Sequence, residues 1–164
     1  MQIRYAEEKD RLALGHIYCE AWKKAYRGMM PDAFLDGLTD EKAAPKAVAP
    51  GSVLVTEENG VITGLTNFGP PRQAEEKNPG ELRSIYVLPE YWGSGAGAML
   101  LQGAQDVLRD AGYAGVYLWV LRDNSRARRF YNKMGMMDTG IQQQIMLAGT
   151  ELTEVRYELW FRKD

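Results

Sequence analysis

Three glycines at alternate positions form the stretch of this chain whose residue types and spacing best suit chemistry. Gly93, Gly95 and Gly97 follow an apolar run that ends at Pro89, and a helix-forming sequence begins at Ala98. Glycines let backbone N–H groups approach an anion closely, and a helix N-terminus adds unpaired N–H donors with partial positive charge. The spacing is neither the dinucleotide fingerprint G-x-G-x-x-G nor a P-loop. The stretch therefore predicts a phosphate cradle, with a plain flexible turn as the alternative.

The chain has one histidine and one cysteine, and both lie in a segment with helical periodicity. A helix is predicted over residues 7–26, and His16 and Cys19 fall opposite its apolar face. One histidine and one cysteine are too few for a zinc site, so we expect no metal, and we expect His16 to face solvent. A single cysteine cannot form an internal disulfide, which fits a reducing cytoplasm. The apolar face consists of Leu14, Ile17, Tyr18, Ala21, Trp22 and Ala25.

Length and composition indicate a single globular domain over residues 1–164. Hydrophobic residues make up 45% of the chain, and its net charge of −2 gives no reason to expect a nucleic acid or an anionic membrane as partner. No apolar run is long enough to cross a bilayer, and the first residues lack the basic-then-apolar order of a signal peptide. We therefore expect a cytoplasmic protein without a membrane segment.

The glycine stretch needs a strand before it and a helix after it, and the sequence pattern predicts both. An apolar run over 82–88 predicts a buried strand, and an amphipathic pattern over 98–111 predicts a helix packed on a sheet. A second pair follows, with a strand over 116–121 and a helix from a cap at Asn124 to Met134. Other strands are predicted over 2–6, 52–57, 61–68, 136–146 and 152–161, with hairpin turns at Asn59–Gly60 and Gly149–Thr150. This order describes a mixed α/β sheet.

Aromatic and methionine side chains gather around a helix–turn–helix near the N-terminus. A break at Arg27–Gly28 ends the first helix, and Pro31 begins a second, short one. These side chains fit either core packing or the adaptable apolar wall of a substrate pocket, and the sequence leaves both open. The residues are Trp22, Tyr26, Met29, Met30 and Phe34.

Two separated segments resemble the GCN5-related N-acetyltransferase (GNAT) family. The first, IYVLPEYWGSGAG over residues 85–97, is similar to the family's acetyl-CoA pyrophosphate loop, usually Arg/Gln-x-x-Gly-x-Gly. The second, over residues 118–135, is similar to a strand followed by the helix pattern N-x-x-A-x-x-F-Y-x-K-x-G. The resemblance covers essentially the whole chain. It implies an α/β (α+β) fold with a mixed, mostly antiparallel twisted sheet of about seven strands, flanked by about four helices.

The resemblance also implies where acetyl-CoA binds. Pantetheine would lie along the central strand where it separates from the next, beside Ile85, Tyr86 and Val87. The backbone N–H near Val87 would polarise the thioester carbonyl, and Asn124 would bind the pantetheine arm. Backbone N–H groups of the loop would hold the pyrophosphate, which agrees with the glycine argument. The loop residues are Trp92, Gly93, Ser94, Gly95, Ala96 and Gly97.

Trp92 departs from the family pattern, because it stands where Arg or Gln is usual. An indole offers one N–H and no charge, so a guanidinium contact to phosphate is lost and we expect weaker binding. Alternatively, Trp92 stacks on the cofactor. A basic cluster offers charge to the nucleotide's 3′-phosphate, or is only a solvated helix face. It consists of Arg122, Arg126, Arg128, Arg129 and Lys133.

The resemblance assigns the proton transfers to two side chains. Tyr131 would protonate the leaving thiolate, with a core aromatic as the alternative interpretation. Glu81 would be the general base, because its position resembles that of the base in the histone acetyltransferase branch and desolvation would raise its pKa. Glu81 is alternatively a surface carboxylate or attracts the substrate cation only. Ser84 and Tyr86 are lesser candidates for relaying the proton.

The implied activity is transfer of the acetyl group of acetyl-CoA to a primary amine of a small molecule or peptide, by direct attack in a ternary complex. A non-catalytic acyl-CoA sensor of the same fold is the alternative. Exposed edges of the terminal hairpin would allow a homodimer. A charged loop over 69–80, expected to be exposed and mobile without an apolar anchor, would contribute to specificity. The candidate substrate-binding residues are Trp22, Tyr26, Met29 and Phe34.

Overall fold

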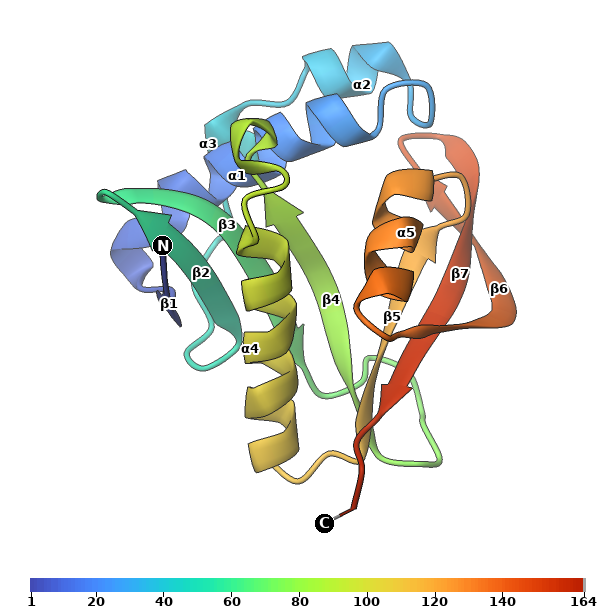
Figure 1. Ribbon diagram of the computed structural model, residues 1–164. Helices are drawn as coiled ribbons and strands as arrows, with labels where there is room; N and C mark the ends of the chain where they lie inside the picture. Colours follow the sequence, from blue (N-terminus) through green and yellow to red (C-terminus); the bar gives the residue numbers. More distant parts are fainter. Residues whose placement is uncertain (164) are drawn as a thin grey trace.

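The computed structural model describes residues 1–163, which form one seven-stranded sheet (Figure 1). The strand order is β1-β2-β3-β4-β5-β7-β6, and all neighbours are antiparallel except β4 and β5. The expected mixed, mostly antiparallel sheet of seven strands is confirmed. The strands are β1 (Gln2–Tyr5), β2 (Val53–Glu58), β3 (Val61–Gly69), β4 (Pro79–Val87), β5 (Gly115–Leu121), β6 (Met137–Leu147) and β7 (Thr150–Trp160).

Helices cover both faces of the sheet, with α4 and α5 on one face and α1, α2 and α3 on the other (Figure 1). Five α-helices occur where about four were expected, because Thr39 caps one turn of helix in a segment that the sequence left open as helix or linker. In the described chain, no helix is long and apolar enough to span a bilayer. The helices are α1 (Arg11–Ala25), α2 (Asp32–Asp36), α3 (Asp40–Ala43), α4 (Ala96–Asp110) and α5 (Ser125–Lys133), with 3₁₀ turns η1 (Glu8–Asp10) and η2 (Pro89–Tyr91).

Each face of the sheet buries its own apolar cluster. The stripe of α4 contributes Leu100 and Leu108 to the larger cluster, which also includes residues of β5 and β7 and Tyr131 of α5. On the other face, α1 contributes Leu14 and Ile17 to a smaller cluster with β2 and β3. The sheet is therefore covered on both sides, which holds β4 and the turn after it in place.

One residue of α1 contradicts the predicted pattern. Cys19 was placed on the solvent side, yet it is buried. The segment after α2 covers that side of α1: the Cys19 thiol donates to the Leu38 carbonyl at 3.5 Å, and a Cβ on Gly15 would collide with the carbonyl of Asp40. His16 is exposed, as predicted.

The two central strands separate soon after they meet (Figure 1). Only Pro79–Glu81 of β4 pairs with Gly115–Tyr117 of β5. Beyond these three pairs the strands diverge toward their C-terminal ends, and the part of β4 after Glu81 has no partner on its β5 side. A wedge therefore opens in the middle of the sheet.

A bulge in β4 sets which side chains face the wedge. Phe68 pairs with Leu82 and Asn67 pairs with Ser84, so Arg83 is an extra residue without a partner in β3. After the bulge, Tyr86 packs with the α1 cluster, whereas Val87 packs with the α4 cluster. The single inserted residue thus turns the aromatic side chain of β4 toward α1.

The loop between β3 and β4 is anchored by ion pairs, which the expectation of a loop without an apolar anchor did not include. Two ion pairs hold it: Glu75 accepts from Arg156 of β7 at 2.6 and 3.1 Å, and Arg72 donates to Glu81 of β4. The alternation of apolar and charged residues over 155–161 predicts that β7 buries one face only. Arg156 lies on its other face and is nevertheless 8% exposed, because this loop covers it.

The anchor gives a test of stability. Replacing Glu75 with Ala leaves the buried Arg156 guanidinium with only Glu158 as partner, so the free energy of unfolding in urea should fall by about 2 kcal/mol. Glu76→Ala is the matched control, because Glu76 is exposed and in the same loop, and it should change the value by less than about 0.5 kcal/mol. Equal effects of the two substitutions would show that the Glu75–Arg156 pair does not anchor the loop.

Candidate functional site

A cavity of about 640 Å³ occupies the wedge between β4 and β5. It extends from the glycine turn at the N-terminus of α4 to the end of α1. Side chains of α1, β4, β5, α5, β6 and β7 line it, so the strand divergence brings together residues far apart in the sequence.

The alternate glycines provide the free backbone donors of the turn. The N–H groups of Trp92 and Ser94 donate to the carbonyls of Pro89 and Tyr91, and that of Ala96 donates to the Ser94 hydroxyl. Within the described chain, the N–H groups of Gly93 and Gly95 have no such partner, and that of Gly97 lies in the first turn of α4, which has no intrahelical acceptor. The six expected donors are therefore reduced to three, which are those of Gly93, Gly95 and Gly97.

Two of these glycines are required by the backbone and the third by packing. Gly93 and Gly95 have φ angles of 80° and 92°, in the left-handed region, and Gly95 is the N-cap of α4. Gly97 is different: a Cβ there would lie 3.3 Å from the Phe130 ring of α5. Gly97 thus allows α5 to pack close to the cradle.

The backbone of β4 offers further hydrogen-bonding groups to the wedge. Leu88 donates to Thr63 of β3, and because successive residues of a strand point to opposite edges, the polar groups of Val87 and Ile85 point toward β5. The Val87 carbonyl is bonded to the indole N–H of Trp92 at 2.8 Å. Trp92 therefore uses its donor within the protein.

Trp92 also holds a positively charged side chain at the wedge. The Arg126 guanidinium of α5 stacks over the Trp92 ring, 3.6 Å from its centroid, and Arg126 lines the cavity. Within the basic cluster, Arg128 instead binds Asp138 and Tyr157, which gives it a structural role.

Asn124 and Tyr131 lie at the two ends of α5. The Asn124 side chain is buried and caps the helix, accepting from Ala127 N–H at 3.2 Å. Tyr131 is 6% exposed and packs against Phe130 and Tyr157, but its hydroxyl makes no hydrogen bond among residues 1–163. Burial raises the pKa of Tyr131, as does the nearby Tyr26, so its hydroxyl stays protonated.

Glu81 does not have the property expected of a general base. Its carboxylate is 2% exposed and accepts from Arg72 three times, at 3.0, 3.0 and 2.8 Å, through the backbone N–H, Nε and Nη2. Burial alone would raise the pKa of Glu81, but the hydrogen bonds from Arg72 outweigh it and lower the pKa. The expectation of a raised pKa is therefore wrong, and Glu81 anchors Arg72 instead.

The α1 side of the cavity differs in part from the predicted substrate pocket. Trp22 and Tyr26 line it, together with Tyr86 of β4, whose hydroxyl lies 3.3 Å from that of Tyr26. Met29 and Phe34 do not line it: Phe34 packs on the Trp22 ring, and the buried Met30 takes the position expected of Met29. The geometry of the turn after α1 determines whether Met29 or Met30 faces the cavity, and helical periodicity in the sequence does not reveal that geometry.

Several lining residues from other parts of the chain were not identified as site residues from the sequence. Arg72 comes from the β3–β4 loop, Ile145 and Leu147 from β6, and Glu154 from β7. Arg72 belongs to the loop over 69–80 that was expected to contribute to specificity. Nothing in the sequence singled out Glu154, because it looks like one of the outward-facing charged residues of an alternating strand.

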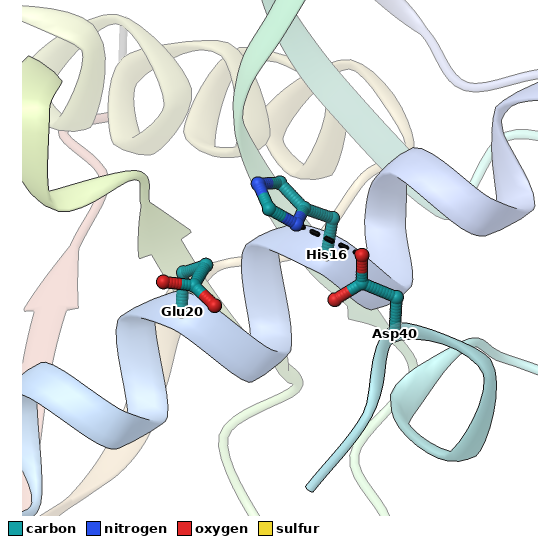
Figure 2. Close-up of side chains that lie close together, drawn as sticks. All are labelled: His16, Glu20 and Asp40. Atoms are coloured by element: carbon teal, nitrogen blue, oxygen red, sulfur yellow. Dashed lines mark hydrogen bonds and ion pairs between the residues drawn. The ribbon is translucent and has the colours of Figure 1, made fainter.

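A second group of polar side chains lies outside the cavity (Figure 2). His16 and Glu20 of α1 and Asp40 of α3 each offer one atom, and these atoms lie within 4.8 Å of one another. His16 Nδ1 is 2.9 Å from the Asp40 carboxylate, which joins α3 to α1. None of the three side chains is buried, and the contact between His16 and Asp40 has a structural role, which is to join α3 to α1.

The cavity residues fit coenzyme A. Three convergent backbone N–H groups at a helix N-terminus suit a pyrophosphate, and the unpaired edge of β4 suits an amide-containing arm that adds to it like a strand. Tyr131 lines the same cavity, and its hydroxyl can give a proton to a leaving group. The arrangement is that of an acyl-transfer site.

Known proteins share this chain's sequence pattern and fold. Residues 13–136 match the model of the acetyltransferase (GNAT) family. The chain is 30% identical over 148 residues to the L-amino acid N-acyltransferase MnaT of Escherichia coli, covering 88% of this chain and 84% of that protein. It is 28% identical over 157 residues to an uncharacterized N-acetyltransferase, YuaI, of Bacillus subtilis, covering 93% and 89%. The structure of the acetyltransferase yncA of Salmonella typhimurium with acetyl-CoA is similar at a TM-score of 0.72 and 27% identity, covering 100% of this chain and 95% of that one.

The glycine cradle gives a test of binding with a matched control. Gly95→Ala puts a side chain at a left-handed φ and costs about 1–2 kcal/mol of stability, and the strain should shift its free N–H and weaken coenzyme A binding roughly tenfold. Gly112→Ala carries the same strain at φ 93°, at the other end of α4, and should leave the affinity unchanged. Calorimetric titration of coenzyme A measures both. Equal affinities in the two variants would remove Gly95 from the binding site.

Proposed function

Since the chain belongs to the GNAT family of acetyltransferases, we propose that it transfers the acetyl group of acetyl-CoA to the primary amine of a small molecule, by direct attack in a ternary complex. It is an acetyl-CoA-dependent acyltransferase of that family. One observation carries the proposal: the free N–H groups of Gly93, Gly95 and Gly97 open onto the same cavity as Tyr131. A non-catalytic sensor would need only the cradle, so turnover decides between the two.

The donor side is built from backbone groups. Acetyl-CoA supplies an acetyl thioester, whose carbonyl carbon accepts the amine. The three glycine N–H groups would hold its pyrophosphate, and Arg126, held on the Trp92 ring, would provide the charge that Trp92 lacks. Ile85 and Val87 would bond the pantetheine arm, and the Val87 N–H would stabilise the oxyanion. To free the Val87 carbonyl, Trp92 would have to release it.

Tyr131 is the proposed acid. Its raised pKa keeps the phenol neutral, so it can donate a hydrogen bond to the thioester sulfur before the reaction. Sulfur becomes basic only as the C–S bond breaks, and proton transfer would therefore coincide with that cleavage.

L-Amino acids are the acceptor class to test first. The Escherichia coli relative is named an L-amino acid N-acyltransferase. Arg72 supports the choice, because its Nε and Nη2 bind Glu81 while its Nη1 has no hydrogen-bond partner in residues 1–163 and is available to a carboxylate. Trp22, Ile145 and Leu147 would contact the side chain of the amino acid.

Thiol release from acetyl-CoA tests the enzyme and the acid together. With a panel of L-amino acids and simple alkylamines, we expect one class to stimulate release, and we expect Tyr131→Phe to lower kcat roughly tenfold or more with unchanged acetyl-CoA affinity. Tyr113→Phe is the control, because Tyr113 packs against the α4 cluster away from the cavity. If Tyr131→Phe turns over as fast as Tyr113→Phe, the acid role is wrong. Acetyl-CoA binding without turnover for any amine would favour the sensor.

A homodimer in the cytoplasm is the proposed state of the protein. β6 is an edge strand of 11 residues, and edge strands present unpaired backbone groups to other chains. Met137, Ile141 and Met146 of β6 are exposed apolar side chains. A second copy pairing along β6 would cover both the unpaired backbone groups and these apolar side chains. The single thiol, Cys19, is buried and free, which suits a reducing compartment.

Light scattering after size exclusion tests the dimer. We expect the protein to elute with twice its chain mass, and Ile141→Lys to elute as a monomer, because the charge would be buried in the proposed interface. Leu12→Lys is the control: it places the same charge at an equally exposed apolar position of α1 and should keep the dimer. A monomeric wild-type protein would exclude the interface.

A further inference from the structure

We propose that Glu154 of β7 takes the proton of the acceptor amine and is the general base of the reaction. This inference rests on the proposed acetyl transfer. It concerns the side of the cavity opposite the glycine cradle, where no role has yet been given to a carboxylate.

Strand register places Glu154 on the acceptor side. It pairs with Leu121 of β5 and with Gln143 of β6, at the end of β5 that borders the wedge. Its neighbour Val155 points into the α4 cluster, so Glu154 points to the α1 face of the sheet. There it lines the same cavity as Tyr26 and Tyr131.

Electrostatic coupling links Glu154 to the reacting end of the cavity. Burial is the main cause of the raised pKa of Tyr26, and the charge of Glu154 adds to that rise. Glu154, Tyr26 and Tyr131 thus line one cavity and come from β7, from the residue that ends α1 and from α5. An amine held between Glu154 and Tyr131 would lie between its proton acceptor and the acid for the leaving sulfur.

The surroundings leave Glu154 without a dedicated cationic partner. Arg156, two residues along the same strand, is bound to Glu75 and Glu158. Arg72 attracts Glu154 from the β3–β4 loop, but its Nε and Nη2 are bonded to Glu81. An ammonium ion entering the cavity would supply the missing partner.

The surroundings also raise the pKa of Glu154, which is the direction that a general base requires. Burial raises the pKa of Glu154; Glu81 raises it further, whereas Arg72 and a hydrogen bond with Gln143 lower it by less. Tyr26 is neutral when protonated and adds no charge. A carboxylate with a raised pKa is a stronger base that is ionised only at a higher pH than usual. Glu81 has its pKa lowered by Arg72 and is the weaker base of the two.

The proton balance of the reaction assigns one proton to each group. An ammonium nitrogen loses two protons on becoming an amide nitrogen. Glu154 takes the first, which frees the lone pair to form the C–N bond at the acetyl carbonyl carbon. The C–S bond then breaks with its electron pair on sulfur, and Tyr131 gives that sulfur a proton. The second proton of the nitrogen restores Tyr131, and Glu154 releases its proton to solvent.

The test compares Glu154→Gln with Glu151→Gln, an exposed carboxylate three residues away on β7. With the amine that best stimulates thiol release, we expect Glu154→Gln to lower kcat/KM roughly 10²-fold and to lose the fall in rate on the acidic side of the pH profile. Glu154→Asp should recover part of the rate and keep that acidic limb. Melting temperature and acetyl-CoA affinity, measured alongside, should match those of the wild type, which separates a catalytic loss from misfolding.

A second readout does not depend on turnover. Carbon-detected NMR titration of the side-chain carboxyl groups, with Glu154 assigned from Glu154→Gln, should give Glu154 a pKa above the ordinary value of a glutamate side chain. A pKa of Glu154 at or below that ordinary value would overturn the proposal, as would an unchanged rate and pH profile in Glu154→Gln. Failure of the proposed function would look different: no amine would stimulate thiol release by the wild type, whatever the titration of Glu154.

Discussion

Backbone hydrogen bonding is the constraint on which the site depends. A strand that leaves its neighbour exposes N–H and C=O groups that must find other partners or remain in contact with water. β4 leaves β5 after Glu81, and the chain meets the constraint in two ways. The indole of Trp92 bonds the carbonyl of Val87, while other groups on that edge stay open to the cavity. The wedge is thus both a defect in the sheet and the place where an acyl donor can bind as an added strand.

The charged side chains around the wedge differ in whether they form an ion pair. Arg72 neutralises Glu81 at the point where the strands part, and Arg156 neutralises Glu75 where the loop crosses β7. Both pairs fix the β3–β4 loop over the sheet. Among residues 1–163, Glu154 forms no ion pair with an arginine, and that difference from Glu81 and Glu75 is the basis of the role proposed for it. Burial favours a raised pKa at both Glu81 and Glu154, and only at Glu81 do the hydrogen bonds and charge of Arg72 outweigh it.

The sequence predicts what depends on local pattern and fails where a distant segment intervenes. Periodicity and turn residues give the seven strands, and the glycines with Tyr131 give the donor end of the cavity. The sequence does not show that Arg72 binds Glu81, nine residues away, because the pairing depends on how the loop folds back. For the same reason, burial of Cys19 follows from the segment after α2, and the position of Glu154 on the cavity follows from the register between β5 and β7. Glu154 and the exposed charges of β7 look identical in a sequence read alone.

The short parallel seam also has a consequence for cooperativity in folding. The strand hydrogen bonds that join β1–β4 to β5–β7 are confined to three residue pairs, so the sheet is nearly two sheets. Their adhesion depends on side chains: the α4 cluster on one face, and the salt bridge between Glu75 and Arg156 on the other. A molecule bound along β4 and against α5 would add a third attachment, contacting both halves at once. Ligand binding in the wedge would then hold the two halves of the sheet together, because a ligand that binds only the joined form stabilises that form by mass action.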